Sequence, residues 1–161
     1  MCKELWVFGS GISLDTFDYN MAGPDRVALN LSAYVVPDIL GAFTVDYNML
    51  RHYEKYLRGM PVYTTPSRHT FDLPIVLVDV PKNQKSYSAQ AVIFAFEAAG
   101  YSKFYMVGFD SRFGNSGYAK RIHTFCESCP YTNLNRPRDY APINKKIDSL
   151  ESDSEIIWMH G

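Results

Sequence analysis

Short hydrophobic runs alternate with helical segments along most of this 161-residue chain, and that alternation limits the possible folds more than any other feature. The first run, Glu4–Phe8, stops at the glycine turn Gly9–Ser13, which predicts a buried strand followed by a tight turn. Segments 47–58 and 89–99 carry apolar side chains at helical spacing, and a glycine follows each. Strands that alternate with helices predict an α/β fold with a Rossmann-like, mostly parallel sheet and helices on both faces.

The other hydrophobic segments with the length of strands are 26–30, 42–46, 61–65, 73–80, 103–107 and 156–159. Pro74 and Pro81 restrict the segment 73–80 to a short piece or a sheet edge, because proline donates no ladder hydrogen bond. Ser88 is placed to cap the helix that follows it. The segment 143–150 is the last predicted helix.

The alternation fails between 110 and 138, where glycine, proline and asparagine are frequent. Irregular segments of this length are often functional loops. We therefore interpret 111–140 as a lid-like insert with a short helix near 118–126. No repeat and no long linker divides the chain, and single domains usually contain roughly 100 to 200 residues. We expect one domain over 1–161.

Charge and hydropathy exclude some classes of partner. The chain has 16 Lys and Arg against 17 Asp and Glu, with a formal net charge of -1, so no global field attracts nucleic acid or an anionic membrane. No apolar run approaches the roughly 20 residues that span a bilayer, and the first residues have no signal-peptide layout. We expect a cytoplasmic protein with reduced cysteines and small-molecule partners.

The glycine turn Gly9–Ser13 is a candidate phosphate site. A glycine turn between a strand and a helix lets backbone N–H groups approach a phosphate, and the helix start adds partial positive charge. The turn matches neither the dinucleotide fingerprint, which would place a third glycine at Leu14, nor a P-loop. The alternative that it is only a tight turn remains open.

Polar residues follow several predicted strands at the points where these leave the core. Ligands in open α/β sheets collect outside the carboxyl ends of the strands. We therefore expect Asn30, Asp46 and Asp110 at one polar crevice, with Lys85 and Ser88 at the start of the long helix. Such a crevice suits the base, ribose and phosphates of a nucleotide. Taken singly, Asn30 and Ser88 also fit the simpler roles of turn and cap residues.

A histidine and two cysteines lie close together at His123, Cys126 and Cys129. Imidazole and thiolate are zinc ligands, but a structural zinc site needs four of them. Cys2 lies far away in the sequence, and no second ligand pair is evident. We assign no metal ligands here; whether Cys126 and Cys129 hold a metal, pair with each other or simply pack stays open from the sequence.

Three blocks of sequence resemble a known family: Phe8–Leu14, Ala28–Asn30, and the run from Asn83 through Asp110. In order and spacing they are similar to the Rossmann-like bacterial lipooligosaccharide sialyltransferases and to the related domain of the 6-hydroxymethylpterin pyrophosphokinases. The family's first motif typically reads Gly-Asn-Gly-Pro-Ser-Leu, and its helix-strand block ends in Gly-Ile-Asp before a tyrosine-bearing lid. The resemblance spans most of the chain and implies a CMP-type nucleotide-sugar donor.

The resemblance also implies roles for individual residues around the nucleotide. It places Gly9, Ser10 and Gly11 in the loop that contacts the donor phosphate and ribose. It places Asn30 near the nucleotide and Ser88 at the start of the helix that contacts cytosine.

Further residues would stabilise the leaving phosphate. Lys85 stands where the sialyltransferase pattern has an arginine, and Tyr118 stands at a lid tyrosine that contacts the donor phosphate. Arg112 replaces another phosphate-facing tyrosine. Charge and phenol donors both suit this task, and a guanidinium engages phosphate in a bidentate way.

The chain departs from the family pattern at three places. Ser10 replaces the loop asparagine and Ile12 replaces the loop proline. The family's catalytic base is a histidine after the lid, whereas 138–144 contains none. His123 inside the insert is the candidate substitute, because an imidazole with a pKa near 6.5 accepts a proton from a sugar hydroxyl at neutral pH.

Three functions remain open from the sequence. The first is transfer of a sugar from a CMP-sugar, such as CMP-sialic acid, to a hydroxyl of a glycan or a small acceptor. The second is magnesium-dependent diphosphate transfer of the pterin type, with Asp46 and Asp110 as candidate magnesium ligands. The third is a nucleotide-binding or interaction module without catalysis, since fold alone does not establish activity.

Overall fold

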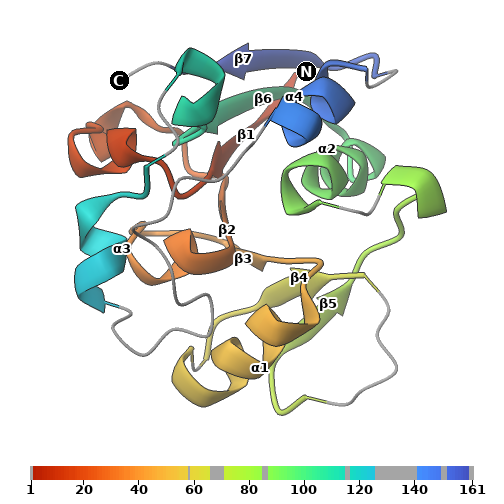
Figure 1. The fold of residues 1–161 in the computed structure, drawn as a ribbon. Coiled ribbons are helices and arrows are strands. Elements are labelled where there is room, and N and C mark those ends of the chain that lie inside the picture. The colour runs from red at the N-terminus through yellow and green to blue at the C-terminus, as the bar shows by residue number, and fades with distance from the viewer. Residues whose placement is uncertain are drawn as a thin grey trace.

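The strands of the described residues form one parallel sheet. The structure is a computed structural model, and it describes residues 2–57, 59–65, 71–84, 87–114, 117–125, 141–149 and 152–159. Within these ranges the sheet has seven strands in the order β5-β4-β3-β2-β1-β6-β7, and every neighbouring pair is parallel. Figure 1 shows the helices around this sheet. The predicted α/β, Rossmann-like fold is confirmed.

The strands of the sheet are β1 (Lys3–Phe8), β2 (Arg26–Leu29), β3 (Gly41–Phe43), β4 (Val62–Thr64), β5 (Ile75–Leu77), β6 (Tyr101–Val107) and β7 (Glu155–Trp158). The α-helices are α1 (Tyr47–Tyr56), α2 (Ser88–Ala98), α3 (Lys120–Phe125) and α4 (Ala141–Asp148). Short 3-10 helices are η1 (Ile12–Asp15), η2 (Tyr19–Met21), η3 (Asn30–Tyr34), η4 (Lys82–Gln84) and η5 (Asp110–Phe113). None of the described helices is long and apolar enough to cross a membrane.

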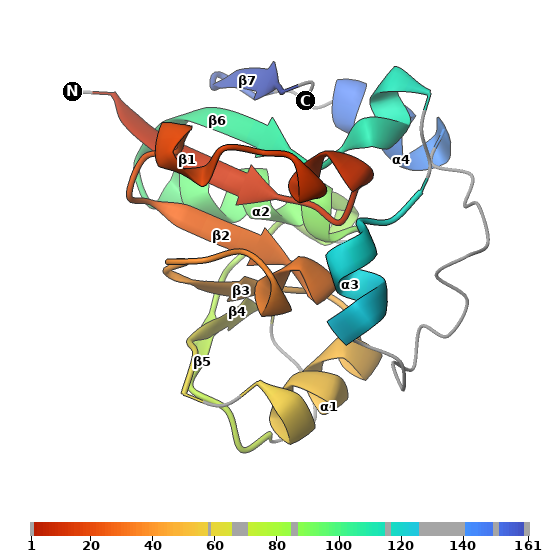
Figure 2. The ribbon, with the colours of Figure 1, turned by 90° about the vertical axis from the view of Figure 1, so that its left-hand side faces the viewer.

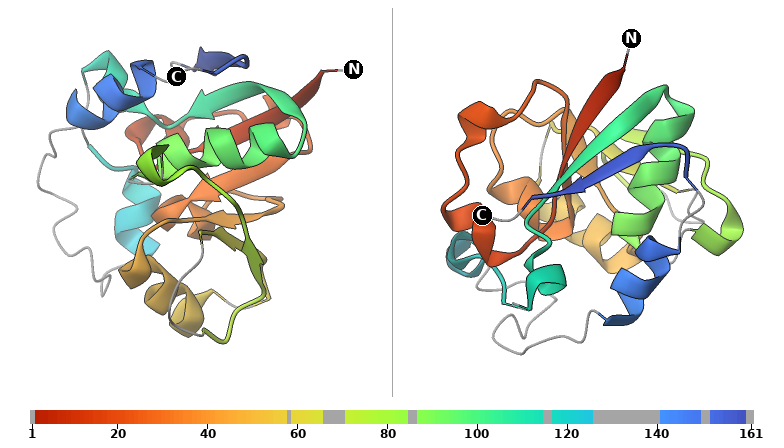
Figure 3. Two further views of the ribbon diagram at one scale, coloured as in Figure 1. Left: turned by 90° about the vertical axis from the view of Figure 1, so that its right-hand side faces the viewer. Right: turned by 90° about the horizontal axis from the view of Figure 1, so that it is seen from above.

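Alternate side chains of β1 enter two separate cores. Leu5 and Val7 belong to the core beneath α2 and α4, whereas Trp6 and Phe8 belong to the core that holds α1, α3 and the segments between β1 and β3. Figure 3 shows these two groups of elements on opposite sides of the strands. A strand covered on both faces needs apolar side chains at consecutive positions, which explains the unbroken run Leu5–Phe8.

The ends of the helices follow partly from the sequence and partly from tertiary contacts. The carboxylate of Asp46 accepts the Asn48 N–H at the start of α1, and Gly100 follows α2 at a φ of 97°. The predicted cap at Ser88 is wrong: the N-cap of α2 is Tyr87, and no side chain caps it. The Ser88 hydroxyl instead accepts the Val45 N–H at 3.1 Å.

The sheet reverses its order at β1. From β1 the chain builds β2, β3, β4 and β5 outward on one side, and it then places β6 on the other side of β1. Figure 2 shows β1, β2 and β6 running in one direction, with α3 beside the carboxyl ends of β1 and β2. The carboxyl ends of β1 and β6 therefore lie at the topological switch point, the position at which ligands bind in open α/β sheets.

Candidate functional site

The glycine turn lies at this switch point and packs tightly against the end of β6. The Gly9 N–H donates to the Val107 carbonyl oxygen and the Gly11 N–H to the Gly108 carbonyl oxygen, each at 2.7 Å. A Cβ at Gly11 would lie 2.5 Å from the Gly108 oxygen, and Gly108 has a φ of 81°. The glycines thus permit a close approach of two backbone segments.

Asp110 joins the same turn through its side chain. Its Oδ2 accepts both the backbone N–H and the hydroxyl of Ser13, each at 2.9 Å. Both residues are 5% exposed. The protein's own carboxylate thus occupies these donors of the turn. The N–H and hydroxyl of half-buried Ser10 have no hydrogen-bond partner within the described part of the chain, so both donors are available to a ligand.

The first part of the insert is docked on the glycine turn. Tyr118 forms an isolated antiparallel bridge with Gly11, and the Ala119 N–H donates to the Ser10 carbonyl oxygen at 3.0 Å. The carboxylate of Asp15 accepts the Lys120 N–H at 2.8 Å, at the start of α3. Ala119 is fully buried. The structure therefore places Tyr118 beside the glycine turn, where the resemblance puts a phosphate-contacting tyrosine.

A second polar cluster lies at the carboxyl ends of β2 and β3. Asn30 follows β2, and its Oδ1 accepts the Thr44 hydroxyl at 2.7 Å and the Ser88 hydroxyl at 3.4 Å. The Tyr53 hydroxyl donates to the Asn30 carbonyl oxygen. Asn30 and Ser88 thus meet as the sequence predicts, and Thr44 and Tyr53 are members that sequence reasoning missed. The signal for Thr44 is its position directly after the predicted buried residues Ala42–Phe43.

The two candidate magnesium ligands belong to different hydrogen-bond sets. Asp46 caps α1 through its side chain, whereas Asp110 binds Ser13 at the glycine turn. No group of three or more His, Cys, Asp or Glu side chains able to hold a metal ion occurs among the described residues.

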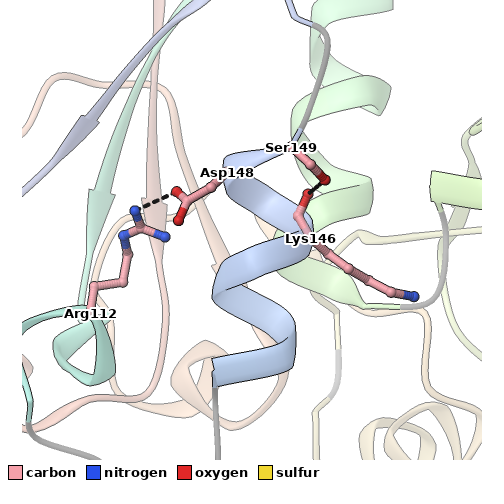
Figure 4. A network of polar contacts seen from close by, with 4 residues as sticks. All are labelled: Arg112, Lys146, Asp148 and Ser149. Atoms are coloured by element: carbon pink, nitrogen blue, oxygen red, sulfur yellow. Dashed lines mark hydrogen bonds and ion pairs between the residues drawn. The ribbon is translucent and has the colours of Figure 1, made fainter.

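Arg112 contacts the C-terminal elements. Its Nη2 lies 2.5 Å from the Asp148 Oδ1 at the end of α4, as Figure 4 shows. The centre of its guanidinium lies 3.9 Å from the centroid of the Trp158 ring in β7. The Arg112 side chain is 17% exposed. Its Nη1 is buried and has no hydrogen-bond partner among the described residues, so Asp148 engages only part of the guanidinium.

His52 differs from expectation. Its neighbours Arg51 and Lys55 suggest a solvated surface position, but His52 is only 7% exposed. Its Nδ1 lies 2.7 Å from the Tyr34 hydroxyl oxygen, and its ring packs against Tyr56. Burial, together with the charge of Lys55, lowers the pKa of His52 below its usual value of 6.5.

Several predicted functional residues lie outside the described part of the structure. These are Lys85, Cys126 and Cys129, and the side chain of His123 in α3. Their roles remain predictions from the sequence.

Comparison of the chain with protein-family models, with curated proteins and with solved structures finds no match in any of the three.

Proposed function

We propose that this protein is a glycosyltransferase-like protein that binds a CMP-sugar and transfers the sugar to an acceptor hydroxyl. One observation carries the proposal. The glycine turn and the Asn30 cluster follow neighbouring parallel strands at the edge where the strand order reverses. Ligands in open α/β sheets bind at this edge. The choice of CMP and of sugar transfer comes from the three resembling sequence blocks.

The proposed reaction assigns a task to each group. The acceptor oxygen forms a bond to the anomeric carbon, and the bond from that carbon to the phosphate oxygen breaks. CMP leaves with the electron pair, and its phosphate is stabilised by Lys85, Arg112 and Tyr118. The proton of the acceptor hydroxyl goes to His123. Asn30 and Ser88 contact the nucleotide.

Magnesium-dependent diphosphate transfer has less support. Its candidate ligands, Asp46 and Asp110, are each engaged by backbone N–H groups of different segments. The third function, a binding module without catalysis, is distinguished from sugar transfer by the test below.

The first test is a thermal-shift panel with CMP, CDP, UMP, GMP, AMP and ATP, each with and without magnesium, because a ligand that binds the folded state raises its stability. We expect a selective shift with CMP or CDP, followed by measurable consumption of CMP-sialic acid. CMP binding without consumption would support the binding module. A shift only with ATP and magnesium would support diphosphate transfer.

The role of His123 is tested in the same assay. We expect His123→Ala to retain the CMP shift and to lose consumption of the CMP-sugar, because the base acts on the acceptor and not on the nucleotide. Unchanged turnover would remove His123 from the mechanism.

A further inference from the structure

The side-chain amide of Asn30 is held by two buried hydroxyl groups. Thr44 is fully buried and Ser88 is 7% exposed. Both hydroxyls lie within hydrogen-bond distance of the Asn30 Oδ1, at 2.7 Å and 3.4 Å. The two hydroxyls come from different elements, the end of β3 and the first turn of α2, so the cluster forms only in the folded sheet.

Each hydroxyl also accepts a backbone N–H, and this fixes the direction of its own proton. The Thr44 Oγ1 accepts the Asp46 N–H at 3.0 Å, and the Ser88 Oγ accepts the Val45 N–H at 3.1 Å. A buried hydroxyl that already accepts a hydrogen bond still needs an acceptor for its proton. The Asn30 Oδ1 is that acceptor. The reverse orientation of the amide would leave both hydroxyl protons without one.

The backbone of Asn30 is fixed as well. Asn30 has a φ of 53°, in the left-handed region, which asparagine tolerates better than most residues. The Tyr53 hydroxyl donates to its carbonyl oxygen. Because both the backbone and the Oδ1 are held, the position of Nδ2 is determined. This nitrogen has no acceptor among the described residues, and the residue is half-exposed.

We infer that Thr44 is a positioning residue, which with Ser88 orients Asn30 so that the Nδ2 N–H groups donate to an acceptor oxygen of the bound nucleotide. This inference rests on the proposed function. An amide nitrogen is a donor only, and the phosphate oxygens and the pyrimidine carbonyl oxygen of CMP are acceptors that it can engage. Thr44 acts through Asn30 and does not itself contact the ligand.

The test compares Thr44→Val with Thr44→Ser by calorimetric titration with CMP, well below the melting temperature of each variant. Valine keeps the shape but removes the hydroxyl, so the amide can rotate. We expect CMP to bind up to about tenfold more weakly to T44V, the effect of one lost hydrogen bond. T44S keeps the hydroxyl, and we expect its affinity to be within about threefold of the wild type.

Thr64 offers a matched control. It is 2% exposed and is the last residue of β4. It directly follows Tyr63, whose partner in β3 is Phe43, the residue before Thr44. Thr64→Val makes the same change at a buried strand end outside the Asn30 cluster. We expect T64V to bind CMP like the wild type. Equal losses in T44V and T64V would indicate general destabilisation and would overturn the positioning role.

Asn30→Asp removes the N–H donors themselves. The aspartate still accepts both hydroxyls, but it presents an oxygen where Asn30 presents N–H donors. We expect T44V and N30D both to lose affinity for CMP. The two partners are distinguished with T44V, which adds no charge. If the partner is the phosphate, inorganic phosphate binds more weakly to T44V and cytidine binding is unchanged; if it is the pyrimidine carbonyl, cytidine binds more weakly and inorganic phosphate binding is unchanged.

The outcomes distinguish this inference from the proposed function. Wild-type protein that binds CMP, with T44V equally tight, would overturn the inference and leave the proposed function intact. Wild-type protein that binds none of the three probes would overturn both.

Discussion

At the scale of single residues, Asp110 shows how a group that looks like a ligand-binding residue also has a structural task. Its carboxylate accepts both donors of Ser13 across a distance of 97 residues in sequence, and it thereby joins the end of β6 to the turn after β1. A strand-end aspartate is typical of ligand sites at this edge. The two hydrogen bonds from Ser13 show that this carboxylate holds the glycine turn against the end of β6.

We expect Asp110→Ala to lower the free energy of unfolding by about 1–3 kcal/mol, because it leaves two buried donors without an acceptor. Urea denaturation measures the change. Ser13→Ala is the matched control: it removes the hydroxyl but keeps the backbone N–H bonded to Asp110, so a loss of about 1 kcal/mol is expected. Wild-type stability in D110A would contradict the structural role.

A second prediction at this scale concerns His52 and acid. Burial lowers the pKa of His52 in the folded protein, whereas in the unfolded chain the value is about 6.5. Below about pH 6.5 the unfolded chain therefore binds more protons than the folded protein. Stability is fully present above that pH and falls as the pH decreases toward the lowered pKa. Urea midpoints measured between about pH 7 and pH 5 test this; His52→Gln should show a smaller decrease, and an equal decrease would assign it to other groups.

At the scale of elements, the junction between β1 and β6 depends on the absence of a side chain at Gly11. A Cβ there would lie 2.1 Å from the Asp110 Oδ2 and 2.5 Å from the Gly108 carbonyl oxygen. The carboxylate can move, but the carbonyl belongs to the backbone of the adjacent segment. Any larger residue must therefore separate the turn from the end of β6.

We expect Gly11→Ala to destabilise the protein by more than about 4 kcal/mol or to prevent folding, the range of severe packing defects. Soluble yield and circular dichroism report the outcome. Gly114→Ala is the control, since a Cβ there meets nothing within 4 Å. Its φ of 88° lies in the left-handed region, so we expect only the backbone cost of about 1–2 kcal/mol. Equal behaviour of the two variants would contradict the steric argument.

Elements with a strong local pattern were predictable, and those set by tertiary contacts were not. The apolar run of β1 and the glycine after α2 identify those elements directly. The strand expected over 42–46 ends at Phe43, because the Thr44 hydroxyl accepts the Asp46 N–H and the chain turns into α1. The strand-end rule places Asn30 at the carboxyl edge of the sheet. The contacts of Thr44 and Tyr53 with Asn30, and the bond from Ser13 to Asp110, depend on side-chain directions that the sequence pattern does not contain.

At the scale of the whole molecule, Arg112 connects the switch-point edge to the C-terminal part of the chain. It follows β6 in η5, pairs with Asp148 at the end of α4, and stacks on Trp158 in β7. Elements that are separate in sequence thus meet at one side chain beside the candidate site. The ion pair with Asp148 and the stack on Trp158 differ in their exposure to water. Asp148 is 58% exposed, whereas Trp158 is partly buried.

This difference predicts how stability responds to salt. An ion pair with an exposed carboxylate is worth about 0–1 kcal/mol and is screened by salt, whereas a cation–π stack away from water is worth about 1–2 kcal/mol. We expect Asp148→Ala to cost less than about 1 kcal/mol at low salt and almost nothing at about 1 M salt. Arg112→Ala should cost about 1–2 kcal/mol under both conditions, as measured by urea denaturation. If the cost of R112A disappears with salt, the ion pair with Asp148 in α4 is the main contribution of Arg112; if it persists, the stack on Trp158 in β7 is the main contribution.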